Sequence, residues 1–151
     1  MGQSLSQMYV HLVFATKGRK PLIAEECEER LHAYMAGILK NMDSPAIIIN
    51  SVPDHIHILF RLSKNYALAK VVEMVKKDSS KWMKQIVNGN RNFSWQIGYG
   101  AFSVSSSALE TVKRYIERQK QHHHIQSFRE EIEEFVLHYD LVEYDPQYFW
   151  D

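Results

Sequence analysis

Two histidines in a short apolar segment are the first residues whose spacing suggests chemistry. His55 and His57 lie in VPDHIHILF, which runs from Val52 to Phe60. Alternate side chains of a β-strand point to one face, roughly 6.5–7 Å apart, so one metal ion could contact both imidazoles. The apolar residues around them indicate a strand that packs on a core. The motif alone also fits a strand whose two histidines merely lie near solvent.

A second polar pair follows about sixty residues later. Tyr115 and Gln119 begin and end the sequence YIERQ. In a helix they are separated by one turn and rise from the same face. A half-buried packing role for Tyr115 and a surface role for Gln119 are the alternatives that these residues leave open by themselves.

The elements that must position these side chains can be predicted from hydrophobic periodicity. Alternation predicts strands, apolar residues at helical spacing predict helices, and Gly, Pro and Asn mark the turns. We predict strands at 8–16, 46–52, 55–62 and 99–105, and helices at 24–42, 66–87, 108–122 and 127–138, with the tail from 144 to 151 left unassigned.

This order of elements predicts a fold class. The pattern β-α-β-β-α-β, followed by further helices, is typical of a ferredoxin-like α+β fold with four antiparallel strands and two helices on one face. We therefore expect a single domain over residues 1–151, with the other sheet face, and the histidine strand on it, free for chemistry. His11, in the first strand, is a further candidate for a place near the metal.

Composition narrows the class of protein. The chain has one cysteine, Cys27, in an acidic stretch, which excludes an internal disulfide framework and fits a reducing cytoplasm. No apolar run is long enough to span a bilayer, and no secretory signal is visible. We expect a cytoplasmic protein without a membrane partner.

Charge is informative through its distribution, because the formal net charge is +0. Basic residues concentrate in two segments and would suit phosphate groups on one face, although solvated helices often look alike. The candidates are Lys17, Arg19 and Lys20 in one segment, and Lys70, Lys77, Lys81 and Lys84 in the other. Phe93 and Trp95, in the loop at 91–98, could stack on bases, but packing on the core is the favoured interpretation.

Beyond these features, the chain resembles a known family nearly end to end. The resemblance is to the single-tyrosine HUH transposases of small bacterial insertion sequences, which move as single-stranded DNA. It is carried by YVHLVFATKGRKPLI, PDHIHIL, KKDSSKWM, YGAFSVSSS and YIERQ.

The resemblance implies a role for each candidate residue. Tyr115 would be the catalytic nucleophile, and His55, His57 and Gln119 would bind a divalent metal, Mg²⁺ or Mn²⁺. The substrate would be single-stranded DNA with a hairpin near each transposon end, cleaved and rejoined through a 5′-phosphotyrosine. It further implies a homodimer in which the helix bearing Tyr115 completes the partner's site.

Two other functions stay open at this level. A catalytically silent or host-adopted relative that binds hairpins in chromosomal repeats would keep the same residues. A ferredoxin-like domain that senses a metal or a small molecule would explain the fold and the two histidines, but it gives Tyr115 and Gln119 no task.

Overall fold

The structure, a computed structural model, describes residues 2–86, 89–123, 127–138 and 144–150. Its strands are β1 (Met8–Ala15), β2 (Ala46–Val52), β3 (His55–Leu62) and β4 (Gly100–Val104). The helices are α1 (Glu25–Asn41), α2 (Leu68–Gln85), α3 (Leu109–Glu117), α4 (Gln119–His123), α5 (Phe128–His138) and α6 (Pro146–Phe149), with short 3-10 helices η1 (Lys17–Arg19) and η2 (Ser106–Ala108).

The four strands form one antiparallel sheet in the order β2-β3-β1-β4. The order β-α-β-β-α-β and this strand arrangement confirm the predicted ferredoxin-like fold. β3 is central, between β2 and β1, so its side chains are supported from both sides. In this register, His57 is paired with Val13 of β1 and with Asn50 of β2.

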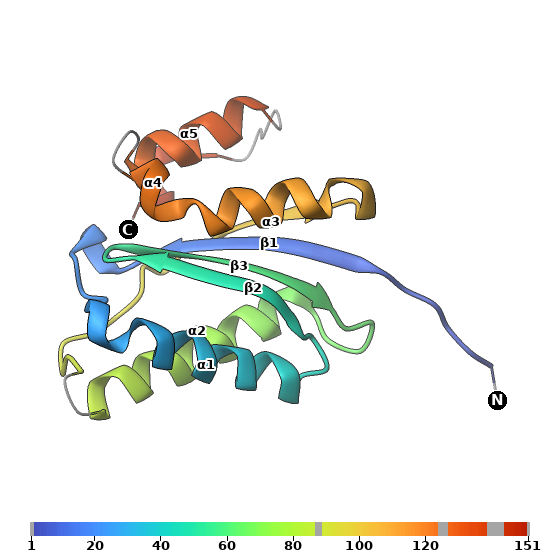
Figure 1. Cartoon of the computed structure of the whole chain (residues 1–151), viewed down its shortest axis with the longest axis horizontal. Coiled ribbons are helices and arrows are strands. Elements are labelled where there is room, and N and C mark those ends of the chain that lie inside the picture. The colour runs from blue at the N-terminus through green and yellow to red at the C-terminus, as the bar shows by residue number, and fades with distance from the viewer. Residues whose placement is uncertain (1, 87–88, 124–126, 139–143, 151) are drawn as a thin grey trace.

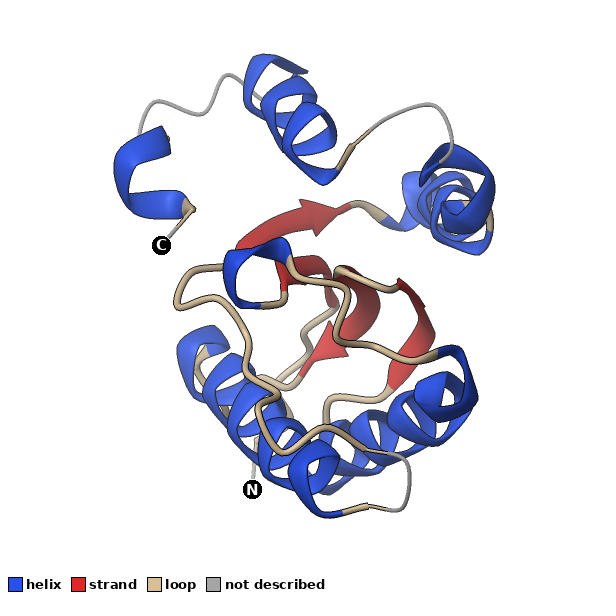
Figure 2. Ribbon diagram, turned by 90° about the vertical axis from the view of Figure 1, so that its left-hand side faces the viewer, coloured by secondary structure: helices blue, strands red, loops and turns tan. Residues whose placement is uncertain are grey.

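The two faces of the sheet are covered by different helices (Figures 1 and 2). Helices α1 and α2 cover one face and bury the main core, which contains Ile56, Ile58 and Phe60 from β3. Because strand side chains alternate, His55 and His57 point to the opposite face. Helices α3, α4 and α5 lie on that side (Figure 1).

The face that carries the histidines is less open than the sequence led us to expect. Phe128 and Ile132 of α5 pack with Val13, Ala15 and Phe102 of the sheet in a second, smaller apolar cluster. The prediction of a free face is therefore wrong, since a C-terminal helix with its own apolar residues covers part of it.

The predicted helix at 108–122 is divided. α3 ends at Glu117, Arg118 leaves helical geometry with φ −94° and ψ 15°, and α4 begins at Gln119. The tail also contains the short helix α6, where no structure was assigned. Among the described residues, none of the helices is long and apolar enough to cross a membrane.

Candidate metal centre and nucleophile

The two imidazoles of β3 are held from behind by other side chains. His55 Nδ1 lies 2.7 Å from Asp54 Oδ1, and His57 Nδ1 lies 2.8 Å from His11 Nε2. Both histidines are almost fully buried, at 2% and 0% exposure. Such partners fix the ring orientation and tautomer of metal-binding histidines, and leave each Nε2 to face the ligand. His11, which the sequence offered only as a candidate for a place near the metal, lies beside the predicted ligand His57.

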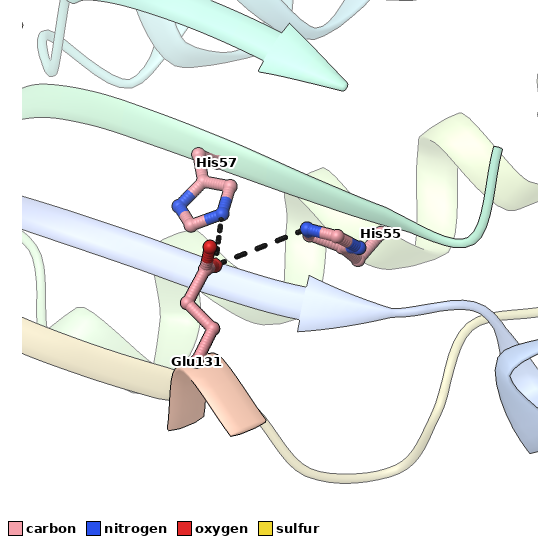
Figure 3. A group of neighbouring side chains, drawn as sticks. All are labelled: His55, His57 and Glu131. Carbon is pink, nitrogen blue, oxygen red and sulfur yellow. Dashed lines mark ion pairs between the residues drawn. The ribbon is translucent and has the colours of Figure 1, made fainter. Parts of the chain in front are cut away.

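The third group at this centre is a carboxylate that the sequence analysis missed. Glu131 of α5 points toward β3 (Figure 3), with Oε1 2.7 Å from His57 Nε2 and 3.9 Å from His55 Nε2. Ligand atoms from these three buried residues all lie within 4.8 Å of one another. One signal could have revealed Glu131: it lies within the apolar face formed by Phe128, Ile132 and Phe135, where a carboxylate needs a partner.

Tyr115 reaches the same centre from α3. Its ring centroid is 5.9 Å from that of His57 and 6.2 Å from that of His11. The β2 side chain of Asn50 supports this end of α3 by donating a 2.8 Å hydrogen bond to the carbonyl of Ile116. A single chain therefore brings Tyr115 to its own histidines.

Gln119 approaches the centre from the first turn of α4. It is only 1% exposed, which removes the surface-amide interpretation. Neither polar atom of its side chain meets hydrogen-bond geometry with a described residue, yet the amide acts on the pKa values of His57 and Tyr115. Buried amides normally have hydrogen-bond partners, so Gln119 remains a candidate ligand for a group bound at this centre.

The pKa values of the side chains at this centre are shifted by burial and by the carboxylate of Glu131. Burial raises the pKa of Tyr115 well above its usual range, and the charge of Glu131 adds to this rise. Burial also lowers the pKa values of His57 and of His11, the latter to about 3, so both are neutral at pH 7. For Glu131, burial acts to raise the pKa, but the hydrogen bond with His57 brings it down to about 2.

These donors fit a divalent cation. Two imidazoles, an ionised carboxylate and an amide converge in one buried place, and the imidazoles already have orienting partners. Imidazole favours transition metals such as Mn²⁺, whereas carboxylate and amide oxygens also suit Mg²⁺. The grouping fits a divalent metal without selecting the ion.

A cavity of about 540 Å³ leads to the tyrosine. We call it the nucleophile pocket; it is lined by His11, Thr111, Val112, Tyr115, Glu134, Phe135 and Leu137. It lies between α3 and α5, and Tyr115 is half-buried at its wall. A substrate group could therefore reach the phenol without unfolding a helix.

The basic candidates fall into two separate places. Lys70, Lys77, Lys81 and Lys84 are exposed on α2, which covers the sheet face opposite the metal centre (Figure 1). Lys17, Arg19 and Lys20 follow β1 directly, at the end of the sheet where Ala15 is paired with His55. Phe93 and Trp95 are buried in the core, which confirms the packing interpretation.

Comparison with known proteins gives the family of the chain. The family described as IS200-like transposase matches residues 4–119, a span that ends at Gln119 and leaves Glu131 outside. The ISDra2 transposase TnpA of Deinococcus radiodurans is 24% identical over 121 residues, which cover 75% of this chain and 84% of that protein.

Two solved structures share the fold. One, from Deinococcus radiodurans R1 and assigned as a transposase, has a TM-score of 0.61 at 21% identity, covering 79% of this chain and 96% of that one. The other is a REP-associated tyrosine transposase bound to a REP hairpin, with a TM-score of 0.58 at 14% identity, covering 82% of this chain and 74% of that one. With the family match extending over strands, histidine motif and tyrosine helix, the chain belongs to the IS200-like transposases.

Proposed function

We propose that this transposase cleaves and rejoins single-stranded DNA by metal-assisted transesterification, with Tyr115 as the nucleophile. The position of the phenol carries the proposal. Tyr115 lies beside His57, and its hydrogen bond with Glu131 lowers the pKa of that carboxyl. Its side chain also lines the nucleophile pocket. A tyrosine that only packed in the core would not contact the candidate metal ligands on one side and line an open cavity on the other.

In this proposal, His55, His57 and Gln119 hold a divalent cation, Mg²⁺ or Mn²⁺, and Glu131 adds a carboxylate ligand. All four side chains are buried, so water competes weakly for the same position. When bound, the cation would polarise the scissile phosphodiester and neutralise charge on the leaving 3′ oxygen.

Tyr115 supplies the covalent step. Its oxygen attacks phosphorus and forms a phosphotyrosine with the 5′ side of the strand, while the bond from phosphorus to the 3′ oxygen breaks. Because burial and Glu131 raise the pKa of the phenol, Tyr115 is protonated at rest and must lose its proton as it attacks. A 3′-OH from another strand can later displace the tyrosine, so the exchange needs neither ATP nor water.

The substrate in this proposal is single-stranded DNA with a hairpin near each transposon end. A relative with the same fold is bound to a REP hairpin, which supports this class of substrate. Lys17, Arg19 and Lys20 lie at the same end of the sheet as His55 and are the better-placed phosphate contacts. The α2 lysines would require DNA to reach the opposite layer.

Trapping the covalent product tests the proposal. Single strands that fold into hairpins, taken from the DNA on each side of the coding region, are incubated with protein and Mn²⁺ and then analysed on a denaturing gel. We expect a protein–DNA adduct and a free 3′-OH product with the natural chain. Tyr115→Phe should abolish the adduct but keep hairpin binding, and Tyr99→Phe is the matched control. An adduct that persists in Tyr115→Phe would reject Tyr115 as the nucleophile.

The proposal also includes a homodimer in which α3 and α4 complete the partner's site, as the family resemblance implies. Mixing the His57→Ala protein with the Tyr115→Phe protein distinguishes a site shared between two subunits from a site formed within one chain. An exchanged dimer contains one intact site, so an adduct should appear on the His57→Ala subunit. If the mixture stays inactive while wild-type protein reacts, each chain uses its own tyrosine.

A further inference from the structure

A second cavity lies where the turn after β1, the loop after α2 and the C-terminal segment meet. We infer that this basic pocket, defined by Lys17, Lys20, Asn90, Asn92 and Trp150, binds one nucleotide of the DNA strand that enters the metal centre. The inference rests on the proposed function and adds a binding site to it. The cavity has a volume of about 500 Å³, which is in the range of small-ligand pockets.

The basic turn is held firmly in place. The amide of Lys17 donates to the carbonyl of Ser94 at 2.9 Å, and the hydroxyl of Thr16 donates to the carbonyl of Lys20 at 2.5 Å. Arg19 has a φ of 55°, a left-handed conformation that non-glycine residues rarely adopt. Backbone strain of this kind persists where the surroundings enforce it, often at binding sites.

The residues that line the pocket favour a ligand that has both a phosphate and hydrogen-bonding groups. Of the described residues that line it, two are lysines and none is acidic, so a phosphate is favoured over a cation. The side-chain amides of Asn90 and Asn92 can donate to and accept from the edge of a base. Lysines, amides and an indole together match a nucleotide better than a bare anion.

Trp150 provides the aromatic surface. It is only partly buried, and guanidinium groups lie near its ring: Arg19 at 5.0 Å and Arg129 at 5.6 Å from its centroid. Bases of single-stranded DNA stack on exposed aromatic rings with little sequence preference, and arginine adds cation–π attraction. A base that takes the place of one of these guanidinium groups could stack on the indole while its phosphate contacts the lysines.

The basic pocket is connected to the metal centre by short contacts. Trp150 packs on Phe128 with ring centroids 5.6 Å apart, and Phe128 stacks on His55 at 4.3 Å. Asp54 forms a second connection, because its carbonyl accepts from the amide of Thr16 while its carboxylate holds His55. A nucleotide here would thus lie next to the strand that reacts.

Binding of a short oligothymidylate tests the inference. The probe is fluorescein-labelled and about a dozen nucleotides long, comparable to known single-strand site sizes, and the protein carries Tyr115→Phe to prevent covalent reaction. We expect the pair Lys17→Ala and Lys20→Ala to weaken binding about tenfold. Losing two phosphate contacts should also reduce the slope of log affinity against log salt by about 1.4.

The pair Lys81→Ala and Lys84→Ala is the matched control, since it removes the same charge from exposed positions on α2. If the control pair loses as much affinity as the pocket pair, or if the pocket pair keeps its affinity and salt slope, the inference is overturned. Tryptophan fluorescence gives an independent readout: the probe should quench emission, and Trp150→Phe should remove most of the quenching. Quenching that survives in Trp150→Phe would also overturn the inference.

Free thymidine monophosphate separates a strand site from a nucleotide site. It should bind much more weakly than the oligonucleotide, and equal affinity would contradict an assignment to DNA. Adduct formation by the wild-type chain is measured in parallel. An adduct with unchanged oligonucleotide binding in the pocket pair rejects the basic pocket but keeps the proposed function. If binding depends on the pocket lysines but the wild-type chain forms no adduct, the basic pocket is kept and the proposed function is rejected.

Discussion

At the scale of single residues, the metal centre depends on side chains that would not touch the metal. Asp54 and His11 each bind the Nδ1 of one imidazole, so the two rings are oriented by different parts of the sheet. For His57 to present a lone pair on Nε2, its Nδ1 must donate to His11, which then acts as a neutral acceptor. The lowered pKa of His11, caused by burial and by the neighbouring His57, is consistent with this role.

Replacing His11 with phenylalanine should therefore weaken metal binding without removing a ligand. We expect Mn²⁺ affinity to fall about 10- to 100-fold in His11→Phe, the usual effect of losing an orienting partner. Titration calorimetry with Mn²⁺ measures it. His11→Gln, which can still accept a hydrogen bond, should recover part of the loss. His32→Phe, on α1 across the sheet, is the control and should bind normally.

Glu131 leads to a prediction about acid stability. Its pKa is about 2 in the folded protein against 4.5 for an ordinary glutamate, so the folded state resists protonation. The stabilisation is complete above about pH 4.5 and is lost as the pH falls toward 2, by up to about 3 kcal/mol. In metal-free urea denaturation, Glu131→Gln should show a flatter loss of stability over this window. The exposed Glu117→Gln should follow the wild type; a parallel curve for Glu131→Gln would contradict the prediction.

At the scale of elements, much of the arrangement could be predicted from local patterns. The alternation in β1 and β3 and the apolar spacing in α1 and α2 gave the sheet and its main core, because these patterns report burial directly. The break at Arg118 could not be predicted, since no glycine or proline marks it. Tyr115 and Gln119 still converge on the centre across this break.

The contribution of α5 was only partly accessible from the sequence. Among the glutamates at 130, 131, 133 and 134, Glu131 stands out by its place on the apolar face of the helix, but its partner His57 follows only from the position of the helix on the sheet. Tertiary packing, rather than residue type, decides which carboxylate is buried. The predicted helix itself is confirmed, as Phe128–His138.

The side chain of Asn50 connects β2 to the C-terminal end of α3. Its amide donates to the carbonyl of Ile116 at 2.8 Å, next to the residue that bears the phenol. We expect Asn50→Ala to lower the free energy of unfolding by about 1 kcal/mol. Adduct formation should fall by a larger factor than stability alone explains, because Tyr115 loses its anchor. Chemical denaturation and the gel assay measure the two effects, and unchanged adduct formation would show that α3 is held by other contacts.

At the scale of the whole molecule, Lys76 connects the helical layer of α1 and α2 to the sheet through the loop before β4. Lys76 of α2 donates to the carbonyls of Gln96, Ile97 and Gly98 at 2.6, 2.9 and 3.0 Å. Burial lowers the pKa of its ammonium to about 8, so the group is still largely charged at neutral pH. The loop carries Gln96, which in turn bonds to β1.

Lys76→Met should therefore destabilise the protein by about 1–2 kcal/mol, because three carbonyls lose a charged donor while the aliphatic stem is kept. Thermal denaturation compares it with Lys77→Met, an exposed neighbour that should change the melting temperature little. Equal melting temperatures for the two variants would show that water replaces the ammonium at no cost.

Gln96 has a consequence for handling the protein. Its side chain accepts from the amide of Ala15 and donates to the carbonyl of Phe149, so the C-terminal segment is attached where β1 ends beside the metal centre. The residues before β1 extend from the opposite end of the sheet (Figure 1). If DNA binds in the basic pocket as inferred, an affinity tag or fluorescent fusion after the C-terminal segment would crowd that pocket, whereas the same addition ahead of β1 would leave it clear.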